Sequence, residues 1–157
     1  MTKSSKIVTV LLGAALSIAV VSLFGLKTSP RSLGSQTTLT IRGQEIKVDI
    51  AAISEARNLG LGGRAVLEPN HGMLFLFEEL GVYGFWMKNM RFPLDIIWIR
   101  DGAVVGFEER VDPQIGVLDS ELKMYFPPSP VDTVLELNSG MVKLLGISIG
   151  DRLKMGL

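Results

Sequence analysis

Four polar residues lie among apolar runs in the central part of the chain, between positions 72 and 110. Lys88 and Asn89 follow an apolar, strand-like segment, and Asp95 and Glu108 lie within two apolar segments further along. Buried strand positions favour apolar side chains, so polar residues there need a partner or a function. These residue types can bind a polar ligand, transfer a proton or hold a cation. We therefore take this stretch as the candidate site.

A β-hairpin is predicted over Leu94–Arg100 and Ala103–Val111, because Asp101-Gly102 suits a two-residue type I′ turn. In such a hairpin the residues that flank the turn pair with each other. That register places Asp95 directly opposite Glu108. A β-bulge within the hairpin would shift the register and remove the pairing.

Two carboxylates that face each other repel, unless a cation, a shared proton or a metal ion lies between them. Three interpretations of this acidic pair stay open. In the first, Lys88, Arg91 or Arg110 neutralises the pair, or water surrounds it. In the second, the pair belongs to a pocket for a polar ligand, together with Trp86, Lys88 and Asn89. In the third, the pair performs acid–base or metal-dependent catalysis.

The composition excludes several other kinds of site. The chain has no cysteine, which excludes disulfides, thiolate metal ligands and a cysteine nucleophile. The single histidine, His71, has no Gly-x-Ser-x-Gly motif as a partner, so we expect a solvent-facing turn residue. Lys plus Arg equals Asp plus Glu at 16 each, without a basic stripe, so no nucleic-acid partner is expected. No cofactor and no metal site are predicted.

An uncharged apolar segment, Ile7–Leu26, follows the basic flank formed by residues 1–6. As a helix it would span about 30 Å, the thickness of the hydrocarbon core of a membrane. The apolar part of a secretory signal is shorter and ends at a small-residue cleavage site, which Ser22-Leu23-Phe24 does not provide. We predict an uncleaved, single-pass anchor, with a cleaved signal or a buried helix as alternatives. Lys3 and Lys6 slightly favour a cytoplasmic N terminus, which places the rest of the chain on the extracytoplasmic side.

The remaining chain is predicted to form a flexible linker at residues 27–37 and one β-rich domain at residues 38–157. The linker is rich in Ser, Gly and Pro. Besides the hairpin above, strands are expected at Thr38–Ile41, Glu45–Ile50, Met73–Phe77, Gly84–Lys88 and Val131–Leu137, with two short ones within Ile147–Met155.

Two short helices complete the predicted domain. They cover Ile53–Leu59, ended by Gly60, and Gly140–Leu145, with Ser139 as the N-cap and Gly146 as the stop. Many strands without regular βαβ alternation indicate an α+β, mostly β fold. We expect a small antiparallel barrel or sandwich-like domain with short helices, behind an N-terminal transmembrane helix.

Four sequence blocks together resemble the uncharacterised family 192 of the domains of unknown function. The blocks are GMLFLF, FWMKN, PLDIIWI and LGISIGDRL, and the likeness covers roughly residues 38–155. The resemblance implies a compact β-rich domain with short helices, often behind a signal peptide or anchor, and no general set of catalytic residues. The family pattern Gly-Leu-Met-aromatic-Arg reads Gly60-Leu61-Gly62-Gly63-Arg64 here. Gly62 and Gly63 thus replace a methionine and an aromatic residue, so a pocket wall formed by those two side chains in the family would be missing here.

These observations predict a membrane-tethered, extracytoplasmic binding or accessory module that holds a small polar ligand or a partner protein. One alternative is a small carboxylate- or metal-dependent enzyme that uses Asp95 and Glu108. Another is a structural partner of a membrane complex that uses an apolar surface near Tyr125 and Phe126.

Overall fold

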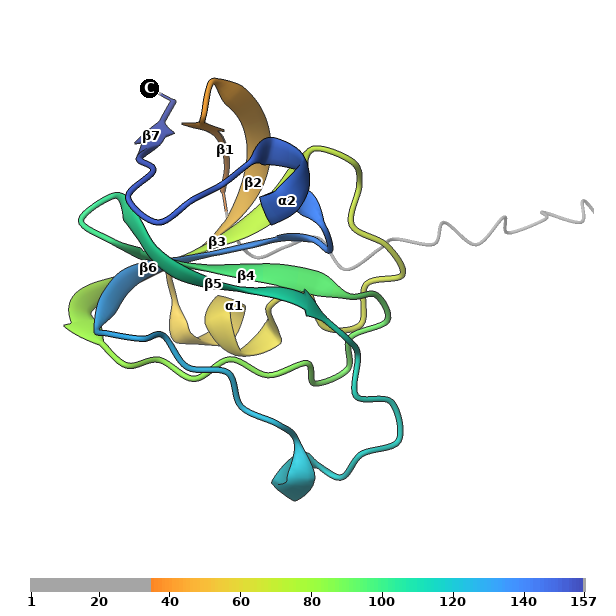
Figure 1. Ribbon diagram of the computed structural model, residues 1–157. Coiled ribbons are helices and arrows are strands. Elements are labelled where there is room, and N and C mark those ends of the chain that lie inside the picture. The colour runs from red at the N-terminus through yellow and green to blue at the C-terminus, as the bar shows by residue number, and fades with distance from the viewer. Residues whose placement is uncertain (1–34, 157) are drawn as a thin grey trace, which may run out of the picture.

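The computed structural model describes residues 35–156, which form a curled β-sheet with short helices (Figure 1). Seven strands follow the order β5-β4-β6-β3-β2-β1-β7 in one mixed sheet. The strands are β1 Gln36–Ile41, β2 Gln44–Ala51, β3 His71–Gly81, β4 Leu94–Arg100, β5 Ala103–Val111, β6 Val131–Asn138 and β7 Leu153–Met155. The helices are α1 Ser54–Leu59, the 3-10 helix η1 Asp119–Glu121 and α2 Met141–Leu145.

The sheet curls until its two edges meet at one end, which makes a half-barrel. Ala103 at the start of β5 forms a bridge with Arg152, just before β7. The N–H of Val104 donates to the carbonyl of Asp151 at 2.8 Å. The prediction of a mostly β domain with short helices is therefore confirmed, but the sheet is not purely antiparallel. β2 and β3 are parallel, because the connection through α1 returns the chain to the edge at which β2 begins.

The tight turn of the β4–β5 hairpin was correctly predicted from its sequence. Asp101 and Gly102 have φ values of 51° and 72°, as a type I′ turn requires. Arg42 and Gly43 have φ values of 50° and 76° and join β1 to β2 in the same way. Glycine and aspartate tolerate this left-handed backbone, so the turn at Asp101-Gly102 has a local cause. In the β1–β2 turn only Gly43 has this preference.

The predicted pairing of Asp95 with Glu108 is wrong. The hairpin begins in the expected register, but it shifts between Trp98 and Ile99 and again between Leu94 and Ile96. Glu108 therefore pairs with Ile96. Paired residues share a face and neighbours along a strand alternate, so Asp95 and Glu108 lie on opposite faces of the sheet.

Each face of the sheet carries its own core. One cluster packs around Phe75, Trp98 and Val134 with Ala56 of α1, and the other packs inside the curl with Val142 of α2. Figure 1 shows α1 and α2 on opposite sides of the strands. The central strands are thus covered on both faces, and a polar residue on either face of them becomes buried.

Several local predictions need correction. Gly84–Lys88 is not a strand, because it makes only an isolated bridge between Phe85 and Tyr125. Ile147–Met155 contains one short strand, β7, and not two. β1 begins at Gln36, within the predicted linker.

The N-cap of α2 was also predicted wrongly. Gly140, with φ 86°, occupies this position in place of Ser139, and it has no side chain of its own to cap the helix. The ends of the two helices were predicted correctly, because α1 ends at Gly60 and α2 ends at Gly146.

The predicted anchor, Ile7–Leu26, lies outside the described residues. Within residues 35–156, no helix combines the length and the apolar character needed to cross a membrane.

Candidate functional site

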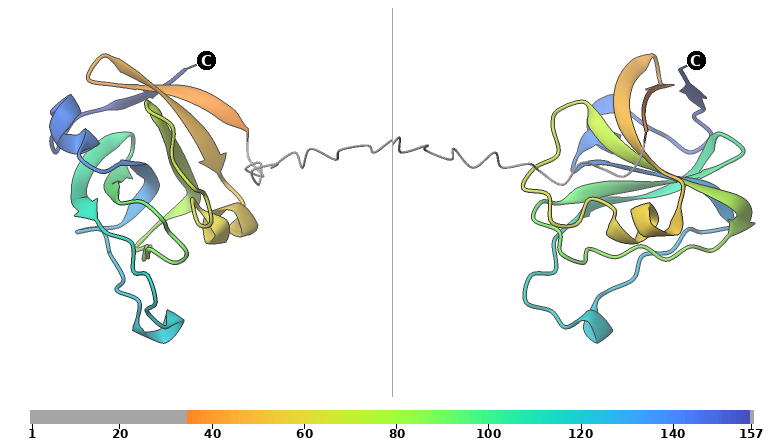
Figure 2. Two further views of the ribbon diagram at one scale, coloured as in Figure 1. Left: turned by 90° about the vertical axis from the view of Figure 1, so that its right-hand side faces the viewer. Right: turned by 180° about the vertical axis from the view of Figure 1, so that it is seen from behind.

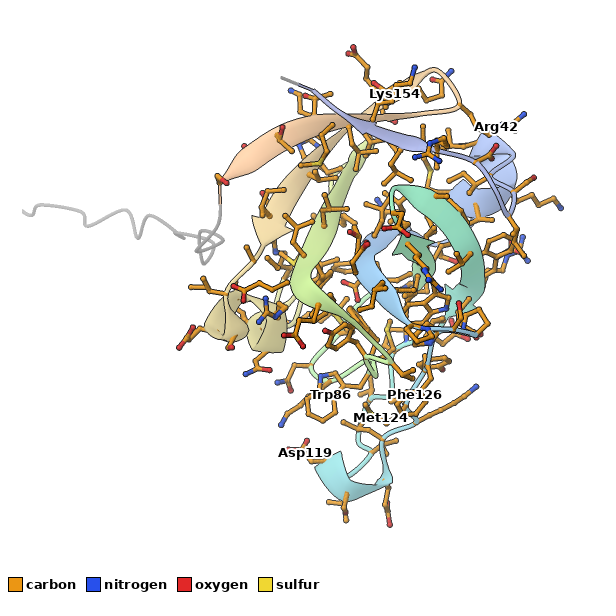
Figure 3. All side chains as sticks on the ribbon, turned by 90° about the vertical axis from the view of Figure 1, so that its left-hand side faces the viewer. Arg42, Trp86, Asp119, Met124, Phe126 and Lys154 are labelled. Carbon is orange, nitrogen blue, oxygen red and sulfur yellow. The ribbon has the colours of Figure 1, made fainter. Side chains whose placement is uncertain are left out.

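A pocket of about 1130 Å³ opens on the face of the sheet that carries α1. Three segments enclose it: residues 57–63, residues 83–91, and residues 114–124, which include η1. Figure 2 shows the η1 segment extending away from the strands in two further views. Figure 3 shows Trp86 and Asp119 close together at this end, with Arg42 and Lys154 at the opposite end of the molecule.

Glu136 of β6 is the buried acid that lines this pocket. It is only 5% exposed, and its neighbours on β3 and β4 are the apolar residues Met73 and Ile96. Burial raises the pKa of Glu136 from 4.5 to about 8, and the positive charge of Arg64 opposes part of that rise. A carboxylate in such surroundings is poorly solvated, so the neutral acid is favoured. At neutral pH the pocket therefore contains a protonated carboxyl, which can donate and accept hydrogen bonds.

Arg64, whose charge acts on this acid, forms a half-buried ion pair with Asp49 of β2. Its Nη1 is 2.7 Å from Asp49 Oδ2, and Gln36 donates to Asp49 Oδ1, also at 2.7 Å. The sheet register aligns Asp49, Met73 and Glu136 in one row across three neighbouring strands. Because Asp49 holds Arg64 directly, the guanidinium influences Glu136 without neutralising it.

The rim of the pocket carries the cations. Lys88 Nζ is 2.5 Å from Asp119 Oδ2 and lies 5.4 Å from the centre of the Trp86 ring. Arg57 lies over the Phe77 ring at 5.1 Å and donates to the carbonyl oxygen of Leu76 at 2.9 Å. These contacts join the η1 segment, α1 and the aromatic residues around one opening.

Lys88→Ala should change the stability of the domain only slightly. The side chains of Lys88 and Asp119 are 36% and 68% exposed, and ion pairs in water contribute less than about 1 kcal/mol. Urea unfolding of Lys88→Ala and of Asp119→Ala measures this contribution from both partners. A loss above about 2 kcal/mol in both variants would contradict the expectation, and would mean that the pair holds the η1 segment in place.

Three of the five predicted site residues line the pocket, and two do not. Trp86, Lys88 and Asn89 belong to its wall. Asn89 has φ 58° and ends the extended segment, so it does not alternate with Lys88 as a strand would. Asp95 and Glu108 are not among the lining residues.

Asp95 stabilises the backbone at the opposite face. It is fully buried and accepts three backbone N–H groups, from Arg110 at 2.8 Å, Gly140 at 3.0 Å and Val142 at 2.8 Å. Two of these donors begin α2, and the third belongs to a bulge residue with φ 54°. The carboxylate thus caps α2 from another strand and fixes the bulge. None of the three interpretations of a facing acidic pair describes this role.

The glycine corner, residues 60–63, forms part of the pocket wall. The N–H of Gly63 donates to the carbonyl of Asn89 at 2.9 Å. A Cβ on Gly62 would lie 3.0 Å from the Leu59 carbonyl oxygen and 3.3 Å from that of Lys88. Gly62 therefore lets the corner pack closely against residues 88–89, and Gly63 adopts a φ of 77° that favours glycine. Neither contributes a side chain to the opening.

Sequence reasoning missed Glu136, although a signal was present. In VDTVLEL, one alternating set contains Asp132, Val134 and Glu136, and the other contains Leu135 and Leu137. An apolar residue, Val134, lies between Asp132 and Glu136 on the same face of the strand, which indicates that this face is also buried. The alternation predicted a strand at Val131–Leu137 but assigned no role to Glu136.

The remaining candidate from the sequence is the single histidine, His71. His71 begins β3, and its Nδ1 lies 3.1 Å from the carbonyl oxygen of Pro69. Among residues 35–156 no three His, Cys, Asp or Glu side chains are grouped so that they could hold a metal ion.

Comparisons with known proteins identify relatives over most of the chain. A family model, DUF192, with the description Uncharacterized ACR, matches residues 37–155. One similar solved structure, a candidate transcription regulator from Sinorhizobium meliloti 1021, is 34% identical with a TM-score of 0.70; the match covers 78% of this chain and 95% of that one. Another, a protein of unknown function from Novosphingobium aromaticivorans DSM 12444, is 28% identical with a TM-score of 0.72; here the shares are 80% and 89%. No curated protein matches the chain.

Proposed function

Because this chain belongs to the DUF192 family, whose description assigns no activity, we propose a function from the geometry: the domain is a binding module that holds a small ligand in the pocket above Glu136. The observation that carries the proposal is the placement of a buried, protonated acid in an open pocket of about 1130 Å³. A core position would be more stable with an apolar residue. A ligand that hydrogen-bonds this carboxyl supplies a reason for the acid.

Binding is better supported than catalysis. The enzyme hypothesis required Asp95 and Glu108 to act together, and they lie on opposite faces of the sheet. The pocket instead combines aromatic walls, a few polar groups and an acid with a perturbed pKa, as small-molecule sites do.

One relative is described as a candidate transcription regulator, but the described helices of this chain give no support for DNA recognition. Major-groove recognition commonly inserts a helix into the DNA. The helices of the described residues span at most six residues, in α1. The expectation that the chain has no nucleic-acid partner stays a prediction.

The domain can be tested as a separate fragment. The two solved relatives match over 95% and 89% of their own lengths, so their fold forms without a segment like residues 1–34 of this chain. The fragment Ser35–Leu157 is therefore suitable for binding and stability measurements. In the full chain, the proposed anchor at residues 7–26 would hold the pocket near the extracytoplasmic surface of the membrane.

A thermal-shift screen of this fragment tests the proposal against sugars, nucleotides, small carboxylates and divalent metals. A pocket ligand at 100 times its dissociation constant adds about 2.7 kcal/mol, which raises the melting temperature by roughly 10 °C. Trp86→Ala removes part of the wall and should reduce the shift. Leu144→Ala, an exposed position on α2, is the matched control and should leave the shift unchanged. A screen without a stabilising compound, or a shift unaffected by Trp86→Ala, would contradict the proposal.

A further inference from the structure

The mouth of the pocket is apolar although it faces solvent. Ile115 is 82% exposed, Trp86 42% and Val117 40%, and all three line the pocket. Solitary apolar residues on a surface are common, but a group around a cavity marks a binding surface. A ligand with an apolar body would cover these side chains and remove them from water.

Basic side chains outnumber acidic ones around this mouth. Among the described lining residues, Arg57, Lys88 and Arg91 are basic, whereas Asp119 is the acid at the rim. Lys88 is paired with Asp119, and Arg57 donates to backbone carbonyls. Arg91 is exposed and has no hydrogen-bond or ion-pair partner within residues 35–156. Its guanidinium is therefore available for an acidic group at the rim.

The inner part of the pocket does not favour a cationic ligand. An ammonium group beside Glu136 would approach the positive charge of Arg64, which acts on the same carboxyl. The interior thus accepts a neutral group, and the charged end of a ligand belongs at the rim.

We infer that the ligand is an amphipathic anion, with an apolar body against the mouth residues Trp86 and Ile115 and an acidic group beside Arg91. This inference rests on the proposed binding function and adds the chemical class of the ligand. The apolar body can be an alkyl chain or an aromatic ring system, because both fit apolar and aromatic walls.

Calorimetric titration of the fragment with decanoate, decylammonium and decanol tests this inference, since the three compounds share one chain length and differ in charge. Below their micelle concentrations, decanoate should bind roughly tenfold more tightly than decylammonium. Arg91→Gln should weaken decanoate binding roughly threefold. Lys143→Gln, an exposed cation on α2, should leave it unchanged. Titration with 8-anilinonaphthalene-1-sulfonate, an aromatic anion, shows which kind of apolar body the pocket prefers, and tight binding of either anion supports the inference.

The outcomes distinguish the binding function of the pocket from the anionic class of its ligand. Stronger binding of decylammonium that is weakened by Trp86→Ala would overturn the anionic class and leave the pocket as a binding site. An unchanged affinity of Arg91→Gln for both anions would also overturn it, because the acidic group would not lie at the rim. If no compound of the set binds, the amphipathic class is overturned, whereas the binding function is decided separately by the thermal-shift screen with sugars, nucleotides and small carboxylates.

Discussion

Glu136→Gln should remove most of the loss of stability that the domain shows as the pH rises from 5 to 8. The unfolded chain releases the proton of Glu136 above its ordinary pKa of 4.5, whereas the folded state keeps it up to about pH 8. Between these values the folded state binds more protons, so the free energy of unfolding falls by about 1.4 kcal/mol per pH unit. This stabilisation is fully present below pH 4.5 and is lost as the pH rises through 8. Glutamine does not titrate, so the variant lacks this slope.

Urea unfolding of the fragment at several pH values between 5 and 9 measures the effect. The variant and the wild type should be similar in stability near pH 5, and the variant should be more stable by several kcal/mol at pH 9. The difference between the two proteins isolates Glu136, because the other titrating groups are common to both. Glu108→Gln is the matched control, since Glu108 is a half-buried acid outside the pocket. Equal pH dependence of wild type and Glu136→Gln would contradict the account.

Asp95→Ala should destabilise the domain by about 3 to 6 kcal/mol, because it leaves three backbone N–H groups, one buried and two partly buried, without an acceptor. The donors belong to Arg110, Gly140 and Val142. A buried donor without an acceptor costs about 1 to 3 kcal/mol, and the partly buried donors cost less because water can reach them. Such a loss approaches the whole stability of a small domain.

Denaturant unfolding checks this expectation with two further variants. Asp95→Asn keeps the shape and one acceptor oxygen, so it should fold and lose about 1 to 3 kcal/mol. Glu108→Gln should change stability by less than about 0.5 kcal/mol. If the two acids repelled each other, Asp95→Asn and Glu108→Gln would both raise stability. That result would contradict the observed register.

Features with local causes could be predicted from the sequence. Asp101-Gly102 specifies its turn, because both residues adopt positive φ readily. Gly60 and Gly146 end their helices for the same reason. Apolar runs such as Met73–Phe77 indicate buried strands wherever they pair.

Features with non-local causes could not be predicted. The register of β4 and β5 depends on two bulges, and one of them is fixed by the bond from Arg110 to Asp95 on a different strand. The role of Asp95 also depends on α2, more than forty residues later in the chain. Glu136 is buried because α1 and residues 83–91 cover the second face of the sheet. A period of two shows which residues share a face, but it does not show that both faces are covered.

The candidate site was therefore predicted in part. Trp86, Lys88 and Asn89 belong to the pocket wall, as the prediction of a polar ligand pocket required. The acid that defines the pocket comes from β6, and the sequence offered only the position of Val134 as a sign of its burial. Asp95 was correctly expected to need partners, since it is fully buried. Its partners are backbone N–H groups, so Asp95 has a structural role and does not bind a ligand in the pocket.

The most direct test of the central claim is a carbon-13 NMR titration of the Glu136 carboxyl in the fragment, with the resonance assigned by its absence from Glu136→Gln. We expect a pKa of about 8, which means that the pocket contains a protonated acid at neutral pH. A carboxyl that titrates near its ordinary value of 4.5 would contradict this. It would show that Glu136 is hydrated or paired, and that the pocket lacks the buried acid from which its binding function is proposed.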